Sequence, residues 1–370
     1  MERMTAMRIM VTGNMGYVGP AVVSHLRQQF DDCTIIGVDT ALFGHCLTER
    51  GLPEHLVDTQ VFSDVRDLTP DLFSGVDAVI HLAAISNDPM GVRFEQVTDE
   101  INHRATLRTA ELAAASGVAR FVFASSCSMY GYAEEGARRE TDPLNPLTAY
   151  ARSKVAAEAG LRDISARTNM LITALRFSTA CGFSGRLRLD LVLNDFVASA
   201  LSTGRVSVLS DGSPWRPLIH VRDMARAIEW ALGRAEYDGF LAINVGCEEW
   251  NYQVRELAEA VKMAIPGIEV DINANAPPDK RSYRVNFDLF RRLAPDHQPR
   301  VTLPAAVADI HDGLVASGFS DANYRSSDLV RLNVLTRGIE SGQLSADVRW
   351  LDRRTADHRD QSSLPFRREA

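Results

Sequence analysis

The chain has 370 residues, of which 45% are hydrophobic and 24% are charged, and its formal net charge is −8 at pH 7. This length and composition predict a globular enzyme with a substantial core and two lobes. A negative net charge without a basic stripe argues against nucleic-acid binding. We find neither a signal peptide nor an apolar run long enough to span a bilayer, so no membrane association is expected.

The five cysteines are scattered along the chain, at Cys33, Cys46, Cys127, Cys181 and Cys247. They show neither the spacing of a metal site nor a disulfide framework, so we expect no metal. Unpaired thiols are typical of reducing compartments, and we therefore expect a cytoplasmic protein.

A strand, a glycine turn and a helix start are predicted near the N-terminus. The apolar run 8–12 leads into Gly13-Asn14-Met15-Gly16-Tyr17-Val18-Gly19 and then into an apolar helix. This arrangement sets a dinucleotide pyrophosphate on a helix N-terminus. Gly13 permits the tight turn, Gly16 lets the backbone approach the phosphates, and Gly19 lets the helix pack on the sheet. The motif is short, and an ordinary turn is the alternative.

The next two predicted strands are followed by carboxylates. Residues 34–39 form a buried strand that ends at Asp39, which would accept hydrogen bonds from the adenosine ribose and repel a 2′-phosphate. Thr40 follows instead of an arginine, which favours NAD over NADP. A third unit, 61–67, places Asp64 beside the adenine, although Asp64 could instead cap a helix.

Strands and helices continue to alternate. We predict strands over 78–84 and 120–124, and between them a helix over 95–116 that Gly117 ends. Alternating units of this kind predict an α/β fold with a Rossmann-type, doubly wound parallel sheet. Its ligands lie beyond the carboxyl ends of the strands. Ser126 falls at such an end.

The main catalytic pattern is Tyr150-Ala151-Arg152-Ser153-Lys154, in which Tyr150 and Lys154 share one face of a predicted helix. All but three of the 40 basic residues are arginine, which indicates that Lys154 does something a guanidinium cannot. A phenol has a pKa of about 10, which an adjacent ammonium lowers, so Tyr150 can exchange a proton during hydride transfer. Ser126 would hold the same oxygen. The alternative for Tyr150 is simple packing on the helix surface.

These segments, in this order, resemble the extended short-chain dehydrogenases/reductases, and among them the NAD-dependent epimerase/dehydratase family acting on nucleotide sugars. Further matches are His81-Leu82-Ala83-Ala84, Ser125 to Gly131, and Pro214 to Asp223. The resemblance implies tightly bound NAD, a nucleotide-diphosphate sugar as substrate, and a homodimer. The helices 95–116 and 148–168 would form the dimer, although their alanines equally suit packing on the sheet.

The resemblance also implies how the chain is divided. Residues 1–175 would form the NAD-binding domain, to which 218–246 returns, and 176–330 a smaller α/β substrate domain. Beyond residue 320 the resemblance fades, and the residues themselves predict a C-terminal extension over 331–370, with Trp350 and Leu351 docked on the body and a polar, mobile end. The residues implied to bind the cofactor are Gly13, Gly16, Tyr17, Val18, Gly19, Asp39, Asp64, Val65, Leu82, Ala83, Ala84, Asn102, Tyr150 and Lys154.

Substrate residues follow from the same resemblance. Arg216 and Arg281 would bind the diphosphate, for which a guanidinium offers bidentate hydrogen bonds, and Asn194 would act with them. Ser86 and Asn87 would touch sugar hydroxyls, although both also suit a plain turn. The residues implied to bind the substrate are Ser86, Asn87, Ser128, Thr179, Asn194, Arg216 and Arg281.

The residues after Ser126 bear on the reaction. In the related 4,6-dehydratases an acidic pair follows the catalytic Ser or Thr, whereas Cys127 and Ser128 stand here, and we interpret Cys127 as a packing residue. The Ser128 hydroxyl resembles the 4-epimerases, although Thr179 stands where many of them carry asparagine. We predict a 4-epimerase that works through a 4-keto intermediate. The alternatives are a 4-dehydrogenase or ketoreductase, a 4,6-dehydratase, a reductase for apolar substrates, and a non-catalytic NAD sensor.

Overall fold

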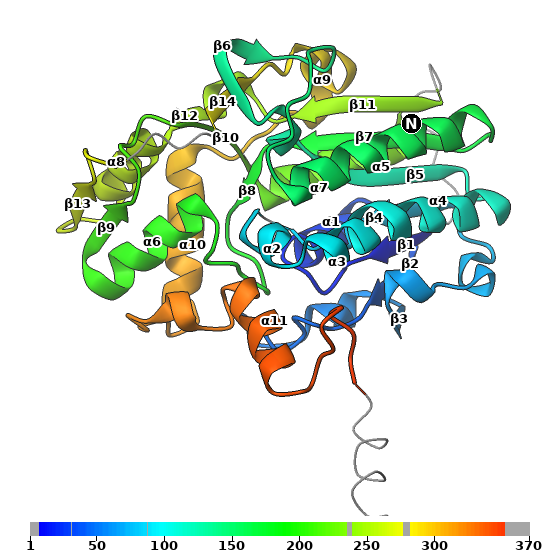
Figure 1. Cartoon of the computed structure of the whole chain (residues 1–370), viewed down its shortest axis with the longest axis horizontal. Coiled ribbons are helices and arrows are strands. Elements are labelled where there is room, and N and C mark those ends of the chain that lie inside the picture. The colour runs from blue at the N-terminus through cyan, green and yellow to red at the C-terminus, as the bar shows by residue number, and fades with distance from the viewer. Residues whose placement is uncertain (1–6, 31, 87, 235–238, 277–281, 352–370) are drawn as a thin grey trace, which may run out of the picture.

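The computed structural model describes residues 7–30, 32–86, 88–234, 239–276 and 282–351 (Figure 1). At its centre is a seven-stranded sheet with the order β11-β7-β5-β4-β1-β2-β3, in which all neighbouring strands are parallel. This confirms the predicted doubly wound α/β fold. The mobile end expected at 352–370 lies outside the described residues. The strands are β1 (Arg8–Thr12), β2 (Thr34–Asp39), β3 (Thr59–Phe62), β4 (Ala78–His81), β5 (Arg120–Ser126), β7 (Leu171–Phe177) and β11 (Phe240–Val245).

Helices cover both faces of this sheet (Figure 1). Ile9 and Val11 point into the core beneath α1 and α7, whereas Met10 points to the core beneath α4 and α5. The predicted single helix 95–116 is interrupted by a π-helical segment, Glu100–Ala105, between α3 and α4. None of the described helices is long and apolar enough to cross a membrane. The helices are α1 (Gly19–Gln29), α3 (Glu95–Asp99), α4 (Thr106–Ala115), α5 (Ala149–Ala166) and α7 (Val221–Gly233).

A second lobe is built mainly from segments that follow β7. Its strands form a three-stranded sheet, β12-β10-β8, and the two-stranded pairs β13-β9 and β14-β6. The core beneath α1 and α7 continues into this lobe through Phe196, Leu257 and Ile310, so the two lobes share one apolar interior. The strands are β6 (Tyr132–Arg138), β8 (Thr179–Cys181), β9 (Arg205–Val208), β10 (Trp215–His220), β12 (Asn251–Gln253), β13 (Glu269–Ile272) and β14 (Ser282–Val285), and the helices are α6 (Val192–Thr203), α8 (Val254–Ala264) and α10 (Leu303–Ala316). Two short helices pack on the central part of the molecule, α2 (Asp88–Arg93) on α3 and α5 and α9 (Asp288–Leu293) on β11.

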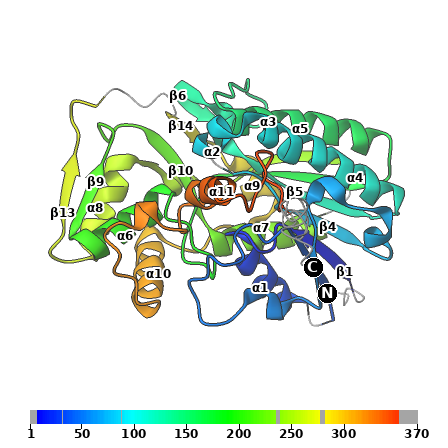
Figure 2. The same ribbon diagram turned by 60° about the horizontal axis from the view of Figure 1, so that its bottom comes forward.

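The last described stretch returns to the central sheet. Helix α11 (Arg331–Glu340) lies where the second lobe meets that sheet, and the chain then turns beside β2 and β3 (Figures 1 and 2). Leu344 and Val348 enter the core beneath α4 and α5. The Trp350 indole nitrogen donates to the carbonyl oxygen of Thr40 at 2.7 Å, which confirms the docking predicted for Trp350.

Candidate active site

A pocket of about 900 Å³ opens at the carboxyl ends of β1, β2, β4, β5 and β7, facing the second lobe. In the sheet, β1 lies between β4 and β2, so the pocket lies at the point where the strand order reverses. Open α/β sheets bind their ligands at this point. The predicted site residues that line the pocket are Gly13, Gly16, Tyr17, Val18, Gly19, Asp39, Asp64, Val65, Leu82, Ala83, Ala84, Ser86, Ser126, Ser128, Tyr150, Lys154, Thr179 and Arg216.

The glycine turn leaves no room for side chains. Gly13 has a φ of 77°, and a Cβ atom added there would lie 2.6 Å from the backbone nitrogen of Ala83. A Cβ atom on Gly19, the first residue of α1, would lie 2.0 Å from the carbonyl oxygen of Asn14. The backbone is therefore exposed to the pocket beside a helix N-terminus, and this arrangement fits a dinucleotide pyrophosphate.

Two carboxylates line the pocket next to this turn. Asp39, at the end of β2, accepts hydrogen bonds from the backbone nitrogens of Met15 at 3.1 Å and Ala41 at 2.8 Å, and burial raises its pKa. Asp64 accepts from the backbone nitrogen of Arg66 at 2.9 Å and also receives that residue's guanidinium at 2.6 and 2.9 Å. Asp64 therefore caps a short helical turn, as in the alternative interpretation, while it also faces the pocket.

The catalytic pattern comes together at the end of β5. Helix α5 begins after Thr148, whose hydroxyl accepts from the backbone nitrogen of Ala151 at 3.1 Å, and so presents Tyr150 and Lys154 to the pocket. The Lys154 ammonium lies 5.7 Å from the centroid of the Tyr150 ring.

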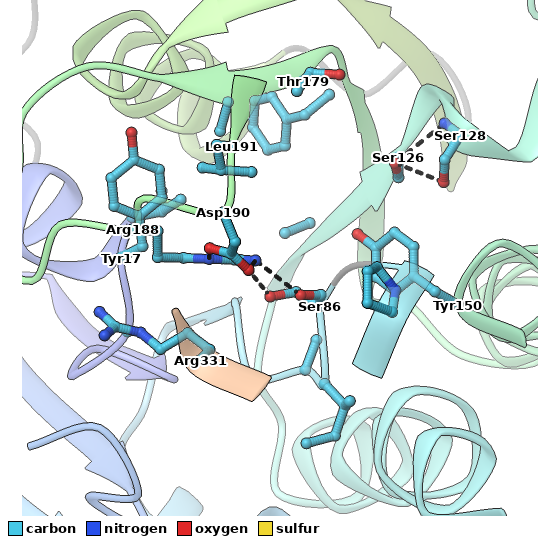
Figure 3. Close-up of a pocket in the computed structure, with 18 of the residues that line it drawn as sticks. Tyr17, Ser86, Ser126, Ser128, Tyr150, Thr179, Arg188, Asp190, Leu191 and Arg331 are labelled. Atoms are coloured by element: carbon cyan, nitrogen blue, oxygen red, sulfur yellow. Dashed lines mark hydrogen bonds and ion pairs between the residues drawn. The ribbon is translucent and has the colours of Figure 1, made fainter. Parts of the chain in front are cut away.

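Ser126 lies across the pocket from Tyr150 (Figure 3). Its hydroxyl donates to the Ser128 hydroxyl at 2.9 Å and accepts from the Ser128 backbone nitrogen at 3.1 Å. A hydroxyl and a phenol therefore face the same space at the carboxyl end of β5, as hydride transfer at a carbinol requires.

The Lys154 side chain is more deeply buried than the sequence suggested. Its Nζ donates to the carbonyl oxygen of Ala124 at 2.7 Å and lies 4.6 Å from the centroid of the Phe123 ring. Burial lowers its pKa from 10.5 to about 7, while the Glu158 carboxylate one turn further along α5 acts in the opposite sense. The charge on Lys154 is therefore sensitive to pH near neutrality, whereas the sequence analysis treated it as a constant cation.

Asn102 is fully buried and is not among the residues that line the pocket, so its predicted contact with the cofactor stays a prediction. Its Oδ1 accepts from the backbone nitrogen of Ile85 at 2.8 Å, and its Nδ2 donates to the Ile85 carbonyl at 2.9 Å and to the Ser153 hydroxyl at 3.2 Å. The predicted strand 78–84 is also too long, because β4 ends at His81 and the following backbone lines the pocket. Asn102 holds that backbone in place.

Asn194 is also fully buried and does not line the pocket, so its predicted contact with the substrate stays a prediction. Its Oδ1 accepts from the backbone nitrogen of Gly182 at 3.1 Å, and its Nδ2 donates to the Tyr17 hydroxyl at 3.0 Å and to the Arg188 carbonyl at 2.9 Å. Because Tyr17 belongs to the glycine turn, Asn194 joins the cofactor side of the pocket to the second lobe.

Buried arginines on the pocket wall were not predicted from the sequence. Arg188 donates to the hydroxyl of Ser86 at 2.7 Å and to its carbonyl at 3.0 Å, and pairs with Asp190 at 2.8 and 2.9 Å (Figure 3). Arg186 pairs with Glu54 at 2.6 and 3.0 Å. Residues 186–190 belong to no helix or strand, so no periodic sequence pattern marked these two arginines as buried.

The remaining predicted substrate residues belong to the second lobe. Thr179 begins β8 and Arg216 lies on β10, and both line the pocket. Arg216 donates to the carbonyl oxygen of Trp215 at 2.9 Å. Asn87 and Arg281 lie outside the described residues. Within the part of the chain that the structure describes, no group of His, Cys, Asp and Glu side chains is arranged to hold a metal ion.

Comparison with known proteins agrees with this geometry. The model of the NAD dependent epimerase/dehydratase family matches residues 9–246. The chain belongs to this family. The resemblance described from the sequence is thereby confirmed, and the protein is an enzyme of the NAD-dependent epimerase/dehydratase class.

Family members similar to this chain differ in the reaction that their names state. The uncharacterized UDP-glucose epimerase YtcB of Bacillus subtilis is 28% identical over 252 residues, covering 66% of this chain and 78% of that protein. UDP-glucuronic acid decarboxylase 6 of Arabidopsis thaliana is 28% identical over 306 residues, covering 80% of this chain and 85% of that protein. The solved structure of MoeE5 in complex with UDP-glucose and NAD superposes with a TM-score of 0.71 at 26% identity, covering 84% of this chain and 99% of that chain.

Proposed function

We propose that the protein is an NAD-dependent nucleotide-sugar 4-epimerase. The observation that carries this proposal is the meeting of Ser126, Tyr150 and Lys154 beside a glycine turn shaped for a dinucleotide. The two residues after Ser126 carry no carboxyl group. Cys127 is buried, its thiol donates to the Arg176 carbonyl at 3.0 Å, and burial raises its pKa well above its usual range. Cys127 is therefore unsuited to remove or deliver a proton in an elimination.

The cofactor site fits NAD. When bound, NAD accepts a hydride from a substrate carbon and can return it. The backbone of the glycine turn would hold the pyrophosphate, Asp39 the adenosine ribose hydroxyls, and Lys154 the nicotinamide ribose. The Asp39 carboxylate would repel a 2′-phosphate, which supports NAD over NADP.

Tyr150 is the proposed acid and base. As the hydride leaves C4 of the sugar, the C4 oxygen becomes a carbonyl and its proton passes to the Tyr150 phenolate. In the return step the phenol gives the proton back to the same oxygen. A charged Lys154 stabilises the phenolate, and the Ser126 hydroxyl is placed to donate a hydrogen bond to the sugar oxygen.

The second-lobe wall supports a nucleotide-diphosphate sugar. The Arg216 guanidinium lines the pocket, and a guanidinium suits a diphosphate. The hydroxyls of Ser86, Ser128 and Thr179 face the same pocket from three segments and would contact the sugar. The ligand and the activity named for MoeE5 and YtcB support a UDP-sugar. The homodimer implied by the resemblance stays a prediction, which light scattering tests.

The experiment is incubation of the purified protein with a panel of UDP-sugars, without added cofactor, followed by chromatography and mass spectrometry. An epimerase gives an isomer of unchanged mass. A product that has lost two hydrogen atoms would instead identify a 4-dehydrogenase. Loss of water would identify a dehydratase, and loss of carbon dioxide from a UDP-uronic acid a decarboxylase.

A further inference from the structure

We infer that residues 331–351 close the adenosine side of the cofactor site and retain the dinucleotide during turnover. We name these residues the C-terminal strap. The inference rests on the proposed function, because the adenosine position follows from Asp39 and the glycine turn. The strap lies beyond residues 9–246, which match the family model. Its contacts are therefore a property of this chain that the family assignment does not supply.

The strap is fastened to the loop that follows β2. Asp39 at the end of β2 and Thr40 and Phe43 from this loop line the pocket. Near the end of the strap, the Trp350 indole nitrogen donates to the Thr40 carbonyl at 2.7 Å. At its start, the Arg331 guanidinium lies 5.1 Å from the centroid of the Phe43 ring. Both ends of the strap therefore contact the segment that would hold the adenosine ribose.

The same strap is fastened to the neighbouring wall, after β3. The Arg66 guanidinium donates to the carbonyl oxygens of Asp347 at 2.9 Å and Val348 at 3.3 Å. The same guanidinium holds the Asp64 carboxylate, which lines the pocket where the adenine is expected. Arg66 thus connects the strap directly to a predicted cofactor residue, and the strap bridges two walls of the adenosine site.

The strap is anchored in the interior of the protein. Leu344 and Val348 are 3% and 1% exposed and belong to the core beneath α4 and α5. Val348 has a φ of 57°, which is uncommon for a β-branched residue and is maintained only where the surroundings fix the backbone. Arg349 adds an ion pair with Asp67. Release of the strap would therefore require partial loss of core packing.

Arg331 brings a buried positive charge to the pocket. Its side chain extends from α11 (Figure 3), and the residue is 2% exposed. It donates to the carbonyl oxygens of Arg186 at 2.8 Å, Leu187 at 3.1 Å and Asp328 at 2.9 Å. Burial lowers its pKa to about 10. The three carbonyl oxygens hold the guanidinium in place, and they fix the start of the strap against residues 186 and 187.

Retention of the cofactor is a requirement of the proposed reaction. The electrons removed from the sugar must still be in the site when the keto sugar is reduced again. The strap holds the Thr40 and Arg66 segments, which form two walls of the adenosine site, in place, and we expect this support to lower the dissociation rate of the dinucleotide. A cofactor held in this way is recycled within one active site.

The dissociation rate of bound NAD tests the inference in the full-length protein. The variants are Trp350→Ala, which removes the bond to Thr40, and Arg66→Met, which removes the bridge to the strap. The matched controls are Met263→Ala and Arg205→Met, two exposed positions of the second lobe. Protein loaded with NAD is mixed with an excess of the fluorescent analogue 1,N6-etheno-NAD, and exchange is followed over time. We expect at least tenfold faster exchange in Arg66→Met, severalfold faster exchange in Trp350→Ala, and wild-type rates in both controls.

A second measurement separates retention from general stability. The melting temperature of each variant is recorded with and without saturating NAD, and epimerase activity is recorded with and without added NAD. The strap variants should gain activity on addition of NAD, whereas the wild type should not. Wild-type exchange rates in both strap variants would overturn the inference and leave the proposed function intact. A wild-type protein that binds no dinucleotide would overturn the proposed function itself.

Discussion

The two sides of the pocket are built by different means. On the sheet side, short contiguous segments carry the geometry, namely the glycine turn 13–19 and the Tyr150–Lys154 pair on α5. On the second-lobe side, the geometry depends on contacts between distant segments. Arg186 pairs with Glu54, 132 residues away, and Arg188 bonds to Ser86, 102 residues away. The chemistry is therefore encoded locally, whereas the shape of the substrate wall depends on the folded second lobe.

The largest effect should come from the sheet side. Tyr150→Phe removes the proposed acid and base while it keeps the ring, so kcat should fall by about 10²- to 10⁴-fold. Steady-state kinetics with the active UDP-sugar measures this, and NAD binding, measured alongside, should change far less than kcat because only one hydroxyl is removed. Tyr132→Phe, at an exposed position, is the matched control. A loss of less than tenfold in Tyr150→Phe would remove Tyr150 from its proposed role.

A substitution on the second-lobe side of the pocket should lower the free energy of unfolding. Arg188→Met removes the guanidinium that pairs with the buried Asp190 carboxylate and breaks both bonds to Ser86, which should cost about 3–5 kcal/mol of unfolding free energy. Denaturant unfolding measures this cost. The double variant Arg188→Met/Asp190→Leu should recover much of the loss, because it also removes the buried carboxylate that Arg188 pairs with. Failure of the double variant to recover would show that the Ser86 bonds, and not the ion pair, hold this wall.

The variant Arg216→Leu distinguishes an enzyme that binds a nucleotide-diphosphate sugar from a reductase for apolar substrates. Removal of a guanidinium that binds a diphosphate should weaken substrate binding by about 2–5 kcal/mol, seen as an increase in KM with a smaller change in kcat. A reductase for apolar substrates would be almost unaffected by this change. Arg205→Met, at an exposed ion pair, controls for the general loss of a cation.

The smallest effect concerns Lys154 and pH. Its pKa is about 7 in the folded protein and 10.5 ordinarily, so between these values the unfolded chain binds more protons. Stability of the cofactor-free protein should therefore rise with pH across this window. Lys154→Met should lack this contribution. Denaturant unfolding of both proteins from pH 7 to pH 10 should give curves that converge as pH rises, and parallel curves would contradict the assigned environment.

The elements on the sheet side of the pocket could be predicted from the sequence because the patterns that indicate them are local. Apolar runs, a glycine turn and an i,i+4 pair each depend on a few adjacent residues. The prediction extended the strand at 78–84 too far because Leu82 and Ala83 are as apolar as strand residues, although they line the pocket. The π-helical interruption of the helix 95–116 left no pattern that we could recognise.

Local patterns predict neither the direction in which a side chain points nor the partners it finds in distant segments of the chain. Asn102 and Asn194 were expected to touch ligands, but a buried amide can equally satisfy backbone groups, and the fold decides between the two. Arg188 and Arg331 were missed because nearly all the basic residues are arginine and nothing local marks the buried ones. Their partners, Ser86 and the carbonyl of Arg186, become neighbours only after the second lobe and α11 have folded.

The most direct test of the central claim follows the hydride at C4. Two substrates are mixed without added cofactor, one UDP-glucose deuterated at C4 and the other labelled uniformly with carbon-13, and the UDP-galactose formed is examined by mass spectrometry. Hydride removal and return within one closed site predict that deuterium stays at C4 of the sugar that brought it. Deuterium on the carbon-13 sugar, its loss to solvent, or accumulation of a keto sugar would contradict the account.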